Sequence, residues 1–509
     1  MKHFLIILAF SLFAIFIHGY QFAVSDQEIF IPYILKAKDN SLFKYDLLFE
    51  QPSSKLSLFY PVYGVTLKFF DLQVIFFVSY VIFQIAFFSA IFSFSKTLTK
   101  NKNFAYLSLL PFLMPKFIGG TATPTYDNFF GYRSIGVIFL ILYLSHLLQG
   151  KISKAVFFAI AGFSFHPLSI IPNIFLLTGK YIEKMRPRMG RLFRPLILGF
   201  ILIFSVVTII FLKNLFQDDL WLNVIKFRDN YLFPSKWNVR GWASFWMYLF
   251  LIFIFITRLD IKTRKAILLF LSISLTVFIV AYLLIEILKI PQIAKFQLTR
   301  SITSSAYIAL AVSPYFVTQR KIVPKLIGII AFVSLSLNHF SIFLISALSF
   351  ALITLNRSKD YRVSISTSLA LSVIVITILL AAIFNLFDFK NVQFPKQESD
   401  WIDTQIWARS NTNSNDFFLV PPDQTGFRIF SHRPIIADIK DGAVVIYDRN
   451  YAINWFERMQ DLSNFTNLSG DQIQKLKSKY DFNFVVTKSS QHLNFPIIYS
   501  NNTYMIYKI

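Results

Sequence analysis

The sequence predicts a polytopic α-helical membrane protein that carries a small external α/β domain at its C-terminal end. Of the 509 residues, 55% are hydrophobic and 61 are phenylalanine, and apolar stretches of about 15 to 25 residues recur as far as about residue 387. A soluble domain could not bury so many long apolar stretches. After about residue 388 the composition changes: Asp and Asn become frequent and the apolar runs become short.

The charge balance fits the same class of protein. Lys and Arg number 50 against 27 Asp and Glu, which gives a formal net charge of +23, and in polytopic membrane proteins such residues gather in the cytoplasmic loops. We therefore expect membrane lipids, and no nucleic acid, among the partners. The chain has no cysteine, which excludes disulfides, thiolate catalysis and Cys-ligated metals.

The first apolar span covers residues 4–20, and basic loops orient the spans that follow. Such loops come after the spans at about 73–95, 134–148 and 242–257. They contain Lys96, Lys100 and Lys102, then Lys151 and Lys154, then Arg258, Lys262, Arg264 and Lys265. Because basic loops face the cytoplasm, the N-terminus with Lys2 is cytoplasmic and the loop at 21–55 lies outside.

Two apolar stretches, 155–178 and 326–355, have basic residues at both ends, so a single crossing would place one basic cluster on the wrong side. Each is predicted to be a helical hairpin, with turns at His166-Pro167 and Asn338-His339. A helix broken within a membrane requires protein or a water-filled cavity around it. The hairpins included, the chain has about 11 to 13 membrane helices, and a last span at about 365–386 ends outside.

Residues 1–387 thus form the predicted multi-pass transmembrane domain. Residues 388–509 form the external α/β domain, which is long enough to bury a core. Strands are expected at 417–420, 444–447, 482–487 and 504–507. Ser469-Gly470-Asp471-Gln472 has the pattern of a capping box at a helix start, and another helix is expected over 448–462.

The candidate site consists of acids and arginines from several predicted external loops. Asp26 and Glu28 directly follow the first span, where a carboxylate costs little and is available to bind a metal or take a proton. A single residue of this kind is more often an ordinary loop charge than a site residue, so the argument rests on the side of the membrane that they share. The other members are Asp46, Asp127, Arg133 and Arg300, joined by His166 of the first hairpin. Carboxylates suit a divalent cation or a hydroxyl base, and the fork of arginine suits phosphate oxygens.

With these features the chain resembles the GT-C superfamily of integral-membrane glycosyltransferases, which take a sugar from a polyprenyl-phosphate carrier. The resemblance covers the architecture: a first span with an acidic external loop, a body of many helices and an external C-terminal domain. In that superfamily the first external loop carries a modified Asp-x-Asp motif, and Asp26-Gln27-Glu28 is similar to it.

The C-terminal run over 411–440 is similar to uncharacterised bacterial GT-C-like membrane proteins. It includes Asn415-Asp416-Phe417-Phe418-Leu419-Val420-Pro421-Pro422 and Gly426-Phe427-Arg428. The resemblance implies the inner or plasma membrane of a bacterium, with the C-terminal domain on the periplasmic or extracellular side.

The chain departs from the family pattern in two places. The Trp-Trp-Asp-Tyr-Gly motif of oligosaccharyltransferases is missing, and the nearest segment is Asn454-Trp455-Phe456-Glu457-Arg458, which disfavours transfer of a whole glycan to asparagine. The acid pair is also not the commoner Asp-Asp or Glu-Asp, so either Glu28 or Asp46 could be the second working acid.

The expected reaction is inverting transfer of one sugar from a polyprenyl-phosphate donor to a hydroxyl of a glycan, lipid or protein acceptor on the external face. The expected roles are as follows: Asp26 is the general base or a metal-linked acid, Glu28 and Asp46 support it, Arg300 and Arg133 hold the donor phosphate, and Asp127 and His166 are further substrate-binding residues. A divalent cation, Mg or Mn, could be held by Asp26 and Glu28, although an arginine alone can neutralise a phosphate leaving group.

Two other classes of function stay open at this point. One is a lipid or solute transporter or flippase, which would use broken helices along a path through the whole bilayer. The other is a non-catalytic membrane assembly protein that binds partners through its external domain. The polar residues gather on one face, with few charges inside the spans, which favours the glycosyltransferase.

Overall fold

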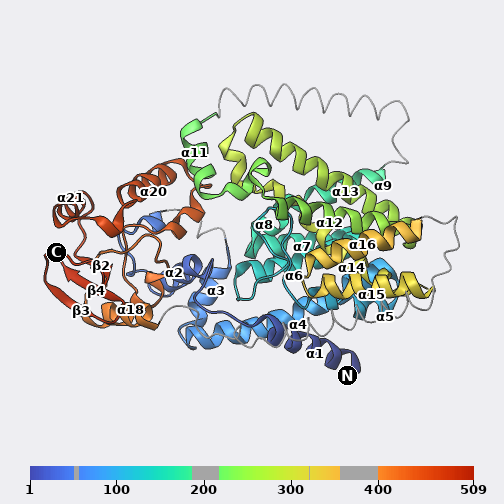
Figure 1. The fold of residues 1–509 in the computed structure, drawn as a ribbon, viewed down its shortest axis with the longest axis horizontal. Coiled ribbons are helices and arrows are strands. Elements are labelled where there is room, and N and C mark those ends of the chain that lie inside the picture. Colours follow the sequence, from blue (N-terminus) through green and yellow to red (C-terminus); the bar gives the residue numbers. More distant parts are fainter. Residues whose placement is uncertain (51–56, 186–216, 320, 356–398) are drawn as a thin grey trace.

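The computed structural model describes residues 1–50, 57–185, 217–319, 321–355 and 399–509 (Figure 1). Apolar helices form a bundle at one end of the molecule and the C-terminal α/β domain lies at the other, so the two chain termini lie at opposite ends of its long axis. This architecture confirms the predicted fold class, a helical membrane protein with a small α/β domain.

Three helical segments are long and apolar enough to cross a membrane within the described ranges. They are Leu72–Thr99 (α4), Val239–Arg258 (α12, Val239–Phe255, with a 3-10 turn) and Ile261–Ile287 (α13, Ile261–Tyr282, with a π turn). Shorter apolar helices pack around them: α1 (Lys2–His18), α6 (Tyr132–Leu148), α7 (Ile152–Phe165), α15 (Ile322–Ser336) and α16 (Phe340–Leu355). Large apolar side chains such as Phe253 and Ile345 remain exposed on the outside, as expected where lipid takes the place of water. The chain is an integral membrane protein, and the predicted span at 365–386 lies outside the described residues.

The first predicted hairpin is broken where the sequence indicates. Helix α7 ends at Phe165, and α8 (Pro167–Ile170) begins directly after His166. Gly136 of α6 makes room for this break, since a Cβ there would lie 2.6 Å from the Cβ of His166. The second arm differs from a simple hairpin, because α9 (Phe175–Met185) packs against α13.

The second predicted hairpin is present, because α15 and α16 pack against each other along their lengths. Asn338 at the turn has a left-handed backbone with φ of 61°, which asparagine tolerates better than most residues. The ammonium of Lys116 donates a hydrogen bond to Oδ1 of Asn338 at 2.7 Å. This contact fixes the tip of the hairpin to the loop that precedes α6.

Shorter elements complete the part of the chain that precedes the C-terminal domain. The first loop contains α2 (Gln27–Lys38), a 3-10 turn at Leu47–Glu50 and α3 (Phe59–Thr66). The others are α5 (Lys102–Leu107), α11 (Asp219–Arg228), α14 (Thr303–Val312) and two consecutive 3-10 helices, η10 (Pro291–Phe296) and η11 (Leu298–Ile302).

The C-terminal domain is built on a mixed four-stranded sheet in the order β1-β2-β4-β3. Its strands are β1 (Phe418–Leu419), β2 (Phe484–Lys488), β3 (Ile497–Ser500) and β4 (Tyr504–Lys508), and only the β1–β2 pair is parallel. Side chains alternate between two cores, as they must along a strand: Phe484 and Val486 face the core around Trp401, whereas Val485 faces the core around Trp455. Its helices are α18 (Ser399–Asn411), α19 (Phe427–Ser431), α20 (Arg449–Asp461) and α21 (Gly470–Tyr480).

The core around Trp455 continues beyond this domain. It includes Leu47 and Leu48 of the first loop and Trp221 and Ile225 of α11. The domain is therefore joined to the membrane part by a shared apolar core.

Most secondary-structure predictions for this domain are confirmed. Ser469 and Gln472 form the expected capping box at the start of α21, and Asp448 caps α20. The strand predicted at 444–447 is wrong, because a 3-10 helix, η14 (Ile439–Val444), ends there and a turn follows. This run is apolar because Val445 and Ile446 are buried in the domain core, not because it pairs in the sheet. The pattern of the sequence did not reveal β3.

The topology can be tested by cysteine labelling in this cysteine-free chain. Asn40 and Asn450 are exposed and lie on the side of the C-terminal domain, so Asn40→Cys and Asn450→Cys should both react with an impermeant maleimide in intact cells. Lys151 lies beyond the start of α7, whose 14 residues hold it about 21 Å from the break at His166. Lys151→Cys should react only after permeabilisation. Protection of Asn450→Cys in intact cells would reverse the predicted orientation.

Candidate functional site

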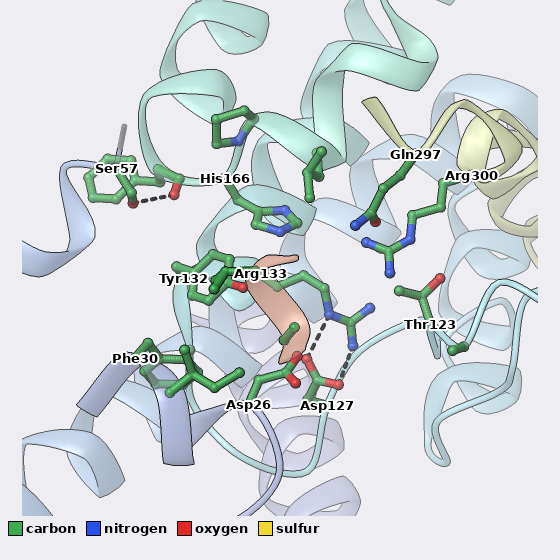
Figure 2. Close-up of a pocket in the computed structure, with 18 of the residues that line it drawn as sticks. Asp26, Phe30, Ser57, Thr123, Asp127, Tyr132, Arg133, His166, Gln297 and Arg300 are labelled. Carbon is green, nitrogen blue, oxygen red and sulfur yellow. Dashed lines mark hydrogen bonds and ion pairs between the residues drawn. The ribbon is translucent and has the colours of Figure 1, made fainter. Parts of the chain in front are cut away.

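A cavity of about 660 Å³ lies where the helix bundle meets the C-terminal domain. Most of its lining comes from five segments: 25–33 at the start of α2, 117–133 up to the first turn of α6, 163–171 around the break after α7, 295–300 across the junction of η10 and η11, and 443–447 of the C-terminal domain. Ser57, Tyr60 and Tyr231 complete the lining. Figure 2 shows polar side chains from these segments directed into this space. The cavity therefore depends on both parts of the chain.

Five of the seven residues predicted for the site line this cavity. They are Asp26, Asp127, Arg133, His166 and Arg300. The other two, Glu28 and Asp46, lie outside it.

Asp26 presents its carboxylate at the start of α2. Its side chain is 55% exposed, and the ammonium of Lys440, from η14 of the C-terminal domain, lies 3.6 Å from its Oδ1. The neighbouring Gln27 fixes this turn, because its buried amide accepts a hydrogen bond from the Val24 N–H and donates one to the Phe130 carbonyl. No pattern in the sequence indicates this role of Gln27.

Arg133 is fully engaged with protein groups. Its Nε donates to Oδ2 of Asp127 at 2.8 Å, a second contact joins Nη2 to Oδ1, and Nη1 donates to the Pro124 carbonyl at 2.8 Å (Figure 2). The charges of Arg133 and Asp127 therefore balance each other. The pair stiffens the loop before α6 and leaves Arg133 little capacity for a further anion.

Arg300 has a different environment. It lies on η11, and its guanidinium is 5.5 Å from the centre of the Tyr231 ring. Within the described residues it forms no ion pair, and its Nε has no hydrogen-bond partner. Lys295 also lines the cavity, so this side of the site carries positive charge that no nearby acid pairs with directly.

His166 lines the cavity at the helix break. Its Nδ1 is hydrogen-bonded to the Ser169 hydroxyl at 2.6 Å, and its ring packs against Tyr132 with 4.8 Å between centroids. A protein partner thus satisfies one ring nitrogen.

Left-handed backbone is frequent around this cavity. Ser25, Ala122 and Gln297 line it and have φ values of 55°, 55° and 47°, a region that residues other than glycine rarely adopt. Each such residue costs of the order of 1–3 kcal/mol. Strain of this kind tends to concentrate at binding sites, where the fold holds it in place.

One part of the cavity wall is apolar and open. Phe117, Phe163 and Phe296 line it while remaining 67%, 48% and 36% exposed. Exposed aromatic side chains beside a helix bundle are suited to contact with lipid. The cavity therefore combines a charged interior with an apolar rim.

Glu28 faces the C-terminal domain. It accepts a hydrogen bond from the Thr425 hydroxyl at 2.8 Å, and burial raises its pKa. Only Gln27 separates it from Asp26 in the sequence, and the helix turns the two side chains to different faces.

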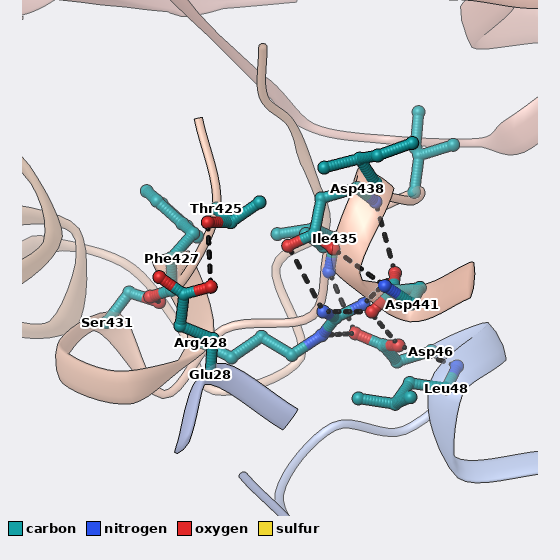
Figure 3. Close-up of polar contacts among 12 residues, drawn as sticks. Glu28, Asp46, Leu48, Thr425, Phe427, Arg428, Ser431, Ile435, Asp438 and Asp441 are labelled. Atoms are coloured by element: carbon teal, nitrogen blue, oxygen red, sulfur yellow. Dashed lines mark hydrogen bonds and ion pairs between the residues drawn. The ribbon is translucent and has the colours of Figure 1, made fainter. Parts of the chain in front are cut away.

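Asp46 belongs to a buried ionic cluster (Figure 3). Its carboxylate accepts two hydrogen bonds from Arg428, at 2.7 and 2.9 Å, and two from the N–H groups of Leu48 and Ile435. Arg428 is only 2% exposed and also donates two hydrogen bonds to Asp441, at 2.8 and 2.9 Å. Through these four hydrogen bonds, the Asp46 carboxylate joins the first loop to the C-terminal domain.

A third acid, Asp438, completes the cluster at 3.8 Å from Arg428. Three carboxylates around one guanidinium would leave an excess of negative charge. Burial, followed by the charge of Asp441, raises the pKa of Asp438 well above its usual range, so the folded state favours the protonated form of this acid.

The two acids predicted to hold a divalent cation face different surroundings. Asp26 faces the cavity and Glu28 faces Thr425, and in the part of the chain that the structure describes no three His, Asp or Glu side chains are arranged to hold a metal ion. A divalent cation at Asp26 and Glu28 stays a prediction.

Part of the C-terminal domain matches a known domain family. The family model of a domain of unknown function, DUF6798, matches residues 399–462, which include Arg428, Asp438 and Asp441. No curated protein matches the chain.

Solved structures of the oligosaccharyltransferase of the archaeon Archaeoglobus fulgidus are similar in fold. The form tethered to an acceptor peptide has a TM-score of 0.50 at 12% identity, over 96% of this chain and 69% of that chain. The apo form has a TM-score of 0.46 and the complex with an inhibitory peptide and a dolichol-phosphate one of 0.41, with the same identity and coverage. The chain thus has a fold distantly similar to that of this oligosaccharyltransferase.

The ionic cluster makes a prediction about stability. The folded state favours the protonated form of Asp438. Its contribution to the free energy of unfolding is therefore greatest at low pH, and it decreases as the pH rises above the pKa of this acid in the unfolded chain, about 3.9. Asp438→Asn keeps the oxygen that accepts from the Asp441 N–H and should match or exceed the parent in melting temperature at pH 8. The difference should shrink at pH 5. Thermal unfolding in detergent, followed between pH 5 and pH 8, measures both.

Arg428→Met is the contrasting variant. It removes the only cation that contacts Asp46 and Asp441 among the described residues, and breaking a buried pair in this way costs about 3–5 kcal/mol. It should unfold at a much lower temperature at pH 8. If Asp438→Asn were equally damaging, Asp438 would have to be ionised and paired.

Proposed function

We propose that this chain transfers a sugar from a polyprenyl-phosphate-linked donor to an acceptor hydroxyl, on the side of the membrane that carries the C-terminal domain. The observation that carries the proposal is the combination found in one cavity: an accessible carboxylate, an arginine with no ion-pair partner among the described residues, and an apolar rim beside the helix bundle. These are the three features that a hydroxyl acceptor, a phosphate and a lipid chain require.

The donor phosphate is placed at Arg300 and Lys295. Both line the cavity, and neither is ion-paired within the described ranges. The guanidinium offers paired N–H donors to phosphate oxygens and neutralises the charge that develops as the phosphate leaves. The lipid chain would leave the cavity across Phe117, Phe163 and Phe296.

Asp26 is the proposed general base. The acceptor hydroxyl loses its proton to this carboxylate while its oxygen attacks the anomeric carbon, and the bond from that carbon to the phosphate oxygen breaks. Attack from the face opposite the phosphate inverts the configuration. The Asp127–Arg133 pair, neutral as a unit, would hold the loop beside Asp26 in position.

The fold supports this class of reaction, since the similar archaeal protein is an oligosaccharyltransferase studied with an acceptor peptide. The acceptor is expected to differ. Trp455, in the segment nearest to the missing motif, is buried in the domain core and donates its indole N–H to the Asp438 carbonyl. It is unavailable to an acceptor peptide, so a hydroxyl of a glycan, lipid or protein remains the preferred acceptor.

The base can be tested by a charge-removing substitution. Asp26→Asn should fold normally, because an exposed acid contributes little to packing, and should lower sugar transfer by about 10²-fold to 10⁴-fold. Asp39→Asn is the matched control: it changes an exposed acid of the same loop that does not line the cavity, and transfer should be unchanged. The assay follows radiolabelled sugar from a polyprenyl-phosphate donor in membranes that contain only the variant.

The phosphate site can be tested with the same donor. Arg300→Ala should weaken donor binding, and Arg300→Lys should restore only part of it, because a point charge cannot replace a paired fork. If neither Asp26→Asn nor Arg300→Ala changes transfer or any cell-surface glycan, the glycosyltransferase proposal should be abandoned for a transporter or an assembly protein.

A pH dependence follows from Asp229, which lies near this site. Burial raises its pKa to about 7, with Arg228 and Arg300 lowering it and Asp26 raising it. Below pH 7 the carboxyl is neutral; above pH 7 its negative charge opposes an anion held at Arg300. Binding of a sugar phosphodiester, whose own charge is constant here, should therefore weaken from pH 6 to pH 8. Asp229→Asn should remove most of this change.

A further inference from the structure

Two side chains of the cavity are carried by one tight turn. The Arg300 N–H donates to the Gln297 carbonyl at 2.9 Å, and the Gln297 N–H donates to the Ala294 carbonyl at 3.0 Å. Figure 2 shows that the side chains of Gln297 and Arg300 enter the cavity next to each other. A ligand held by one of them is therefore within reach of the other.

Gln297 is a costly residue at this position. Its backbone is left-handed, with φ of 47°, where glycine or asparagine would be less strained. Its side chain is 4% exposed, although a buried amide destabilises a fold unless its polar atoms are bonded. Nothing in the local packing explains why a glutamine occupies this site.

The amide of Gln297 is only partly satisfied. Its Nε2 lies 3.4 Å from the Tyr231 hydroxyl, and its Oε1 has no hydrogen-bond partner among the described residues. If the amide is turned around, the same position offers an unbonded N–H instead. In either orientation one polar atom of this cavity-lining side chain has no partner among the described residues.

We propose that Gln297 is the residue that recognises the donor sugar, through a hydrogen bond to the polar substituent on the carbon next to the anomeric carbon. This inference rests on the proposed function. With the phosphate at Arg300, the anomeric carbon is attached to that phosphate, and the substituent at the 2-position of the sugar is the nearest polar group that the neighbouring Gln297 can reach. The substituent at the 2-position is an equatorial hydroxyl, an axial hydroxyl or an acetamido group, and each of these can hydrogen-bond to an amide.

The experiment uses soluble analogues that differ at one carbon. The purified full-length protein is titrated at one pH with glucose 1-phosphate, mannose 1-phosphate, N-acetylglucosamine 1-phosphate, 2-deoxyglucose 1-phosphate and inorganic phosphate. One of the three 2-substituted sugars should bind about 10-fold to 100-fold more tightly than the 2-deoxy sugar, since losing the substituent leaves a buried polar group unbonded.

Gln297→Asn is the informative variant. Asparagine suits the left-handed backbone, so the melting temperature should be maintained, but its amide is one carbon shorter and cannot reach as far. The preference over the 2-deoxy sugar should fall to about 3-fold or less. Gln292→Asn is the matched control, because Gln292 also has an unbonded Oε1 but does not line the cavity, and it should keep the preference of the parent.

The possible outcomes distinguish a failure of this inference from a failure of the proposed function on which it rests. Arg300→Lys should weaken binding of every phosphate ligand and leave the preference at the 2-position intact. If Gln297→Asn keeps the full preference, or if the parent has none while still binding inorganic phosphate, Gln297 does not read the sugar and the proposed function survives. If the parent binds no phosphate ligand at all, both proposals are overturned.

Discussion

The architecture depends on one buried guanidinium. Arg428 holds Asp46 of the first loop and Asp441 of the C-terminal domain, with Asp438 at its edge. A charge removed so completely from water is tolerated only because every partner is present, and removing one leaves the others uncompensated. The same 3-10 helix that carries Asp441 also brings Lys440 to Asp26 and Val444 to the cavity wall. The ionic cluster thus sets the position of the cavity as well as the contact between the two parts.

The distribution of charge within the cavity decides which residues are available to a ligand. Asp127 and Arg133 neutralise each other, and among the described residues Asp26 has one ion-pair partner, the Lys440 ammonium at 3.6 Å. Arg300 remains without an ion-pair partner within the described ranges. An anion would therefore be attracted to one side of the cavity while the carboxylate on the other side stays accessible, and in the proposed reaction this would separate phosphate binding from proton transfer.

Composition and basic loops were sufficient to predict the membrane helices and the presence of the α/β domain, because both follow from the cost of placing charge in lipid. The predicted topology also grouped five candidate site residues that do line one cavity: Asp26, Asp127, Arg133, His166 and Arg300. They could not show that Asp26 and Glu28 diverge. Residues two apart on a helix are rotated by about 200°, so an acid pair that looks like one motif faces two environments.

Other features required information that a single sequence does not contain. Asp46 and Arg428 are 382 residues apart, and nothing local to either residue marks the other as its partner. The run at 444–447 has the composition of a strand, yet it is apolar because it lies between a domain core and a cavity. No sequence pattern pointed to Gln297, because its left-handed backbone conformation can be recognised only in the structure.

The size of the cavity has a consequence for the carrier. A volume of about 660 Å³ is that of a pocket for a ligand of drug-like size, which is enough for a phosphosugar and the first part of a lipid. A long prenyl chain cannot fold into it and would have to pass the phenylalanine rim into the bilayer. The protein would then recognise only the phosphosugar of the proposed donor, and donors with longer or shorter prenyl chains would bind equally well.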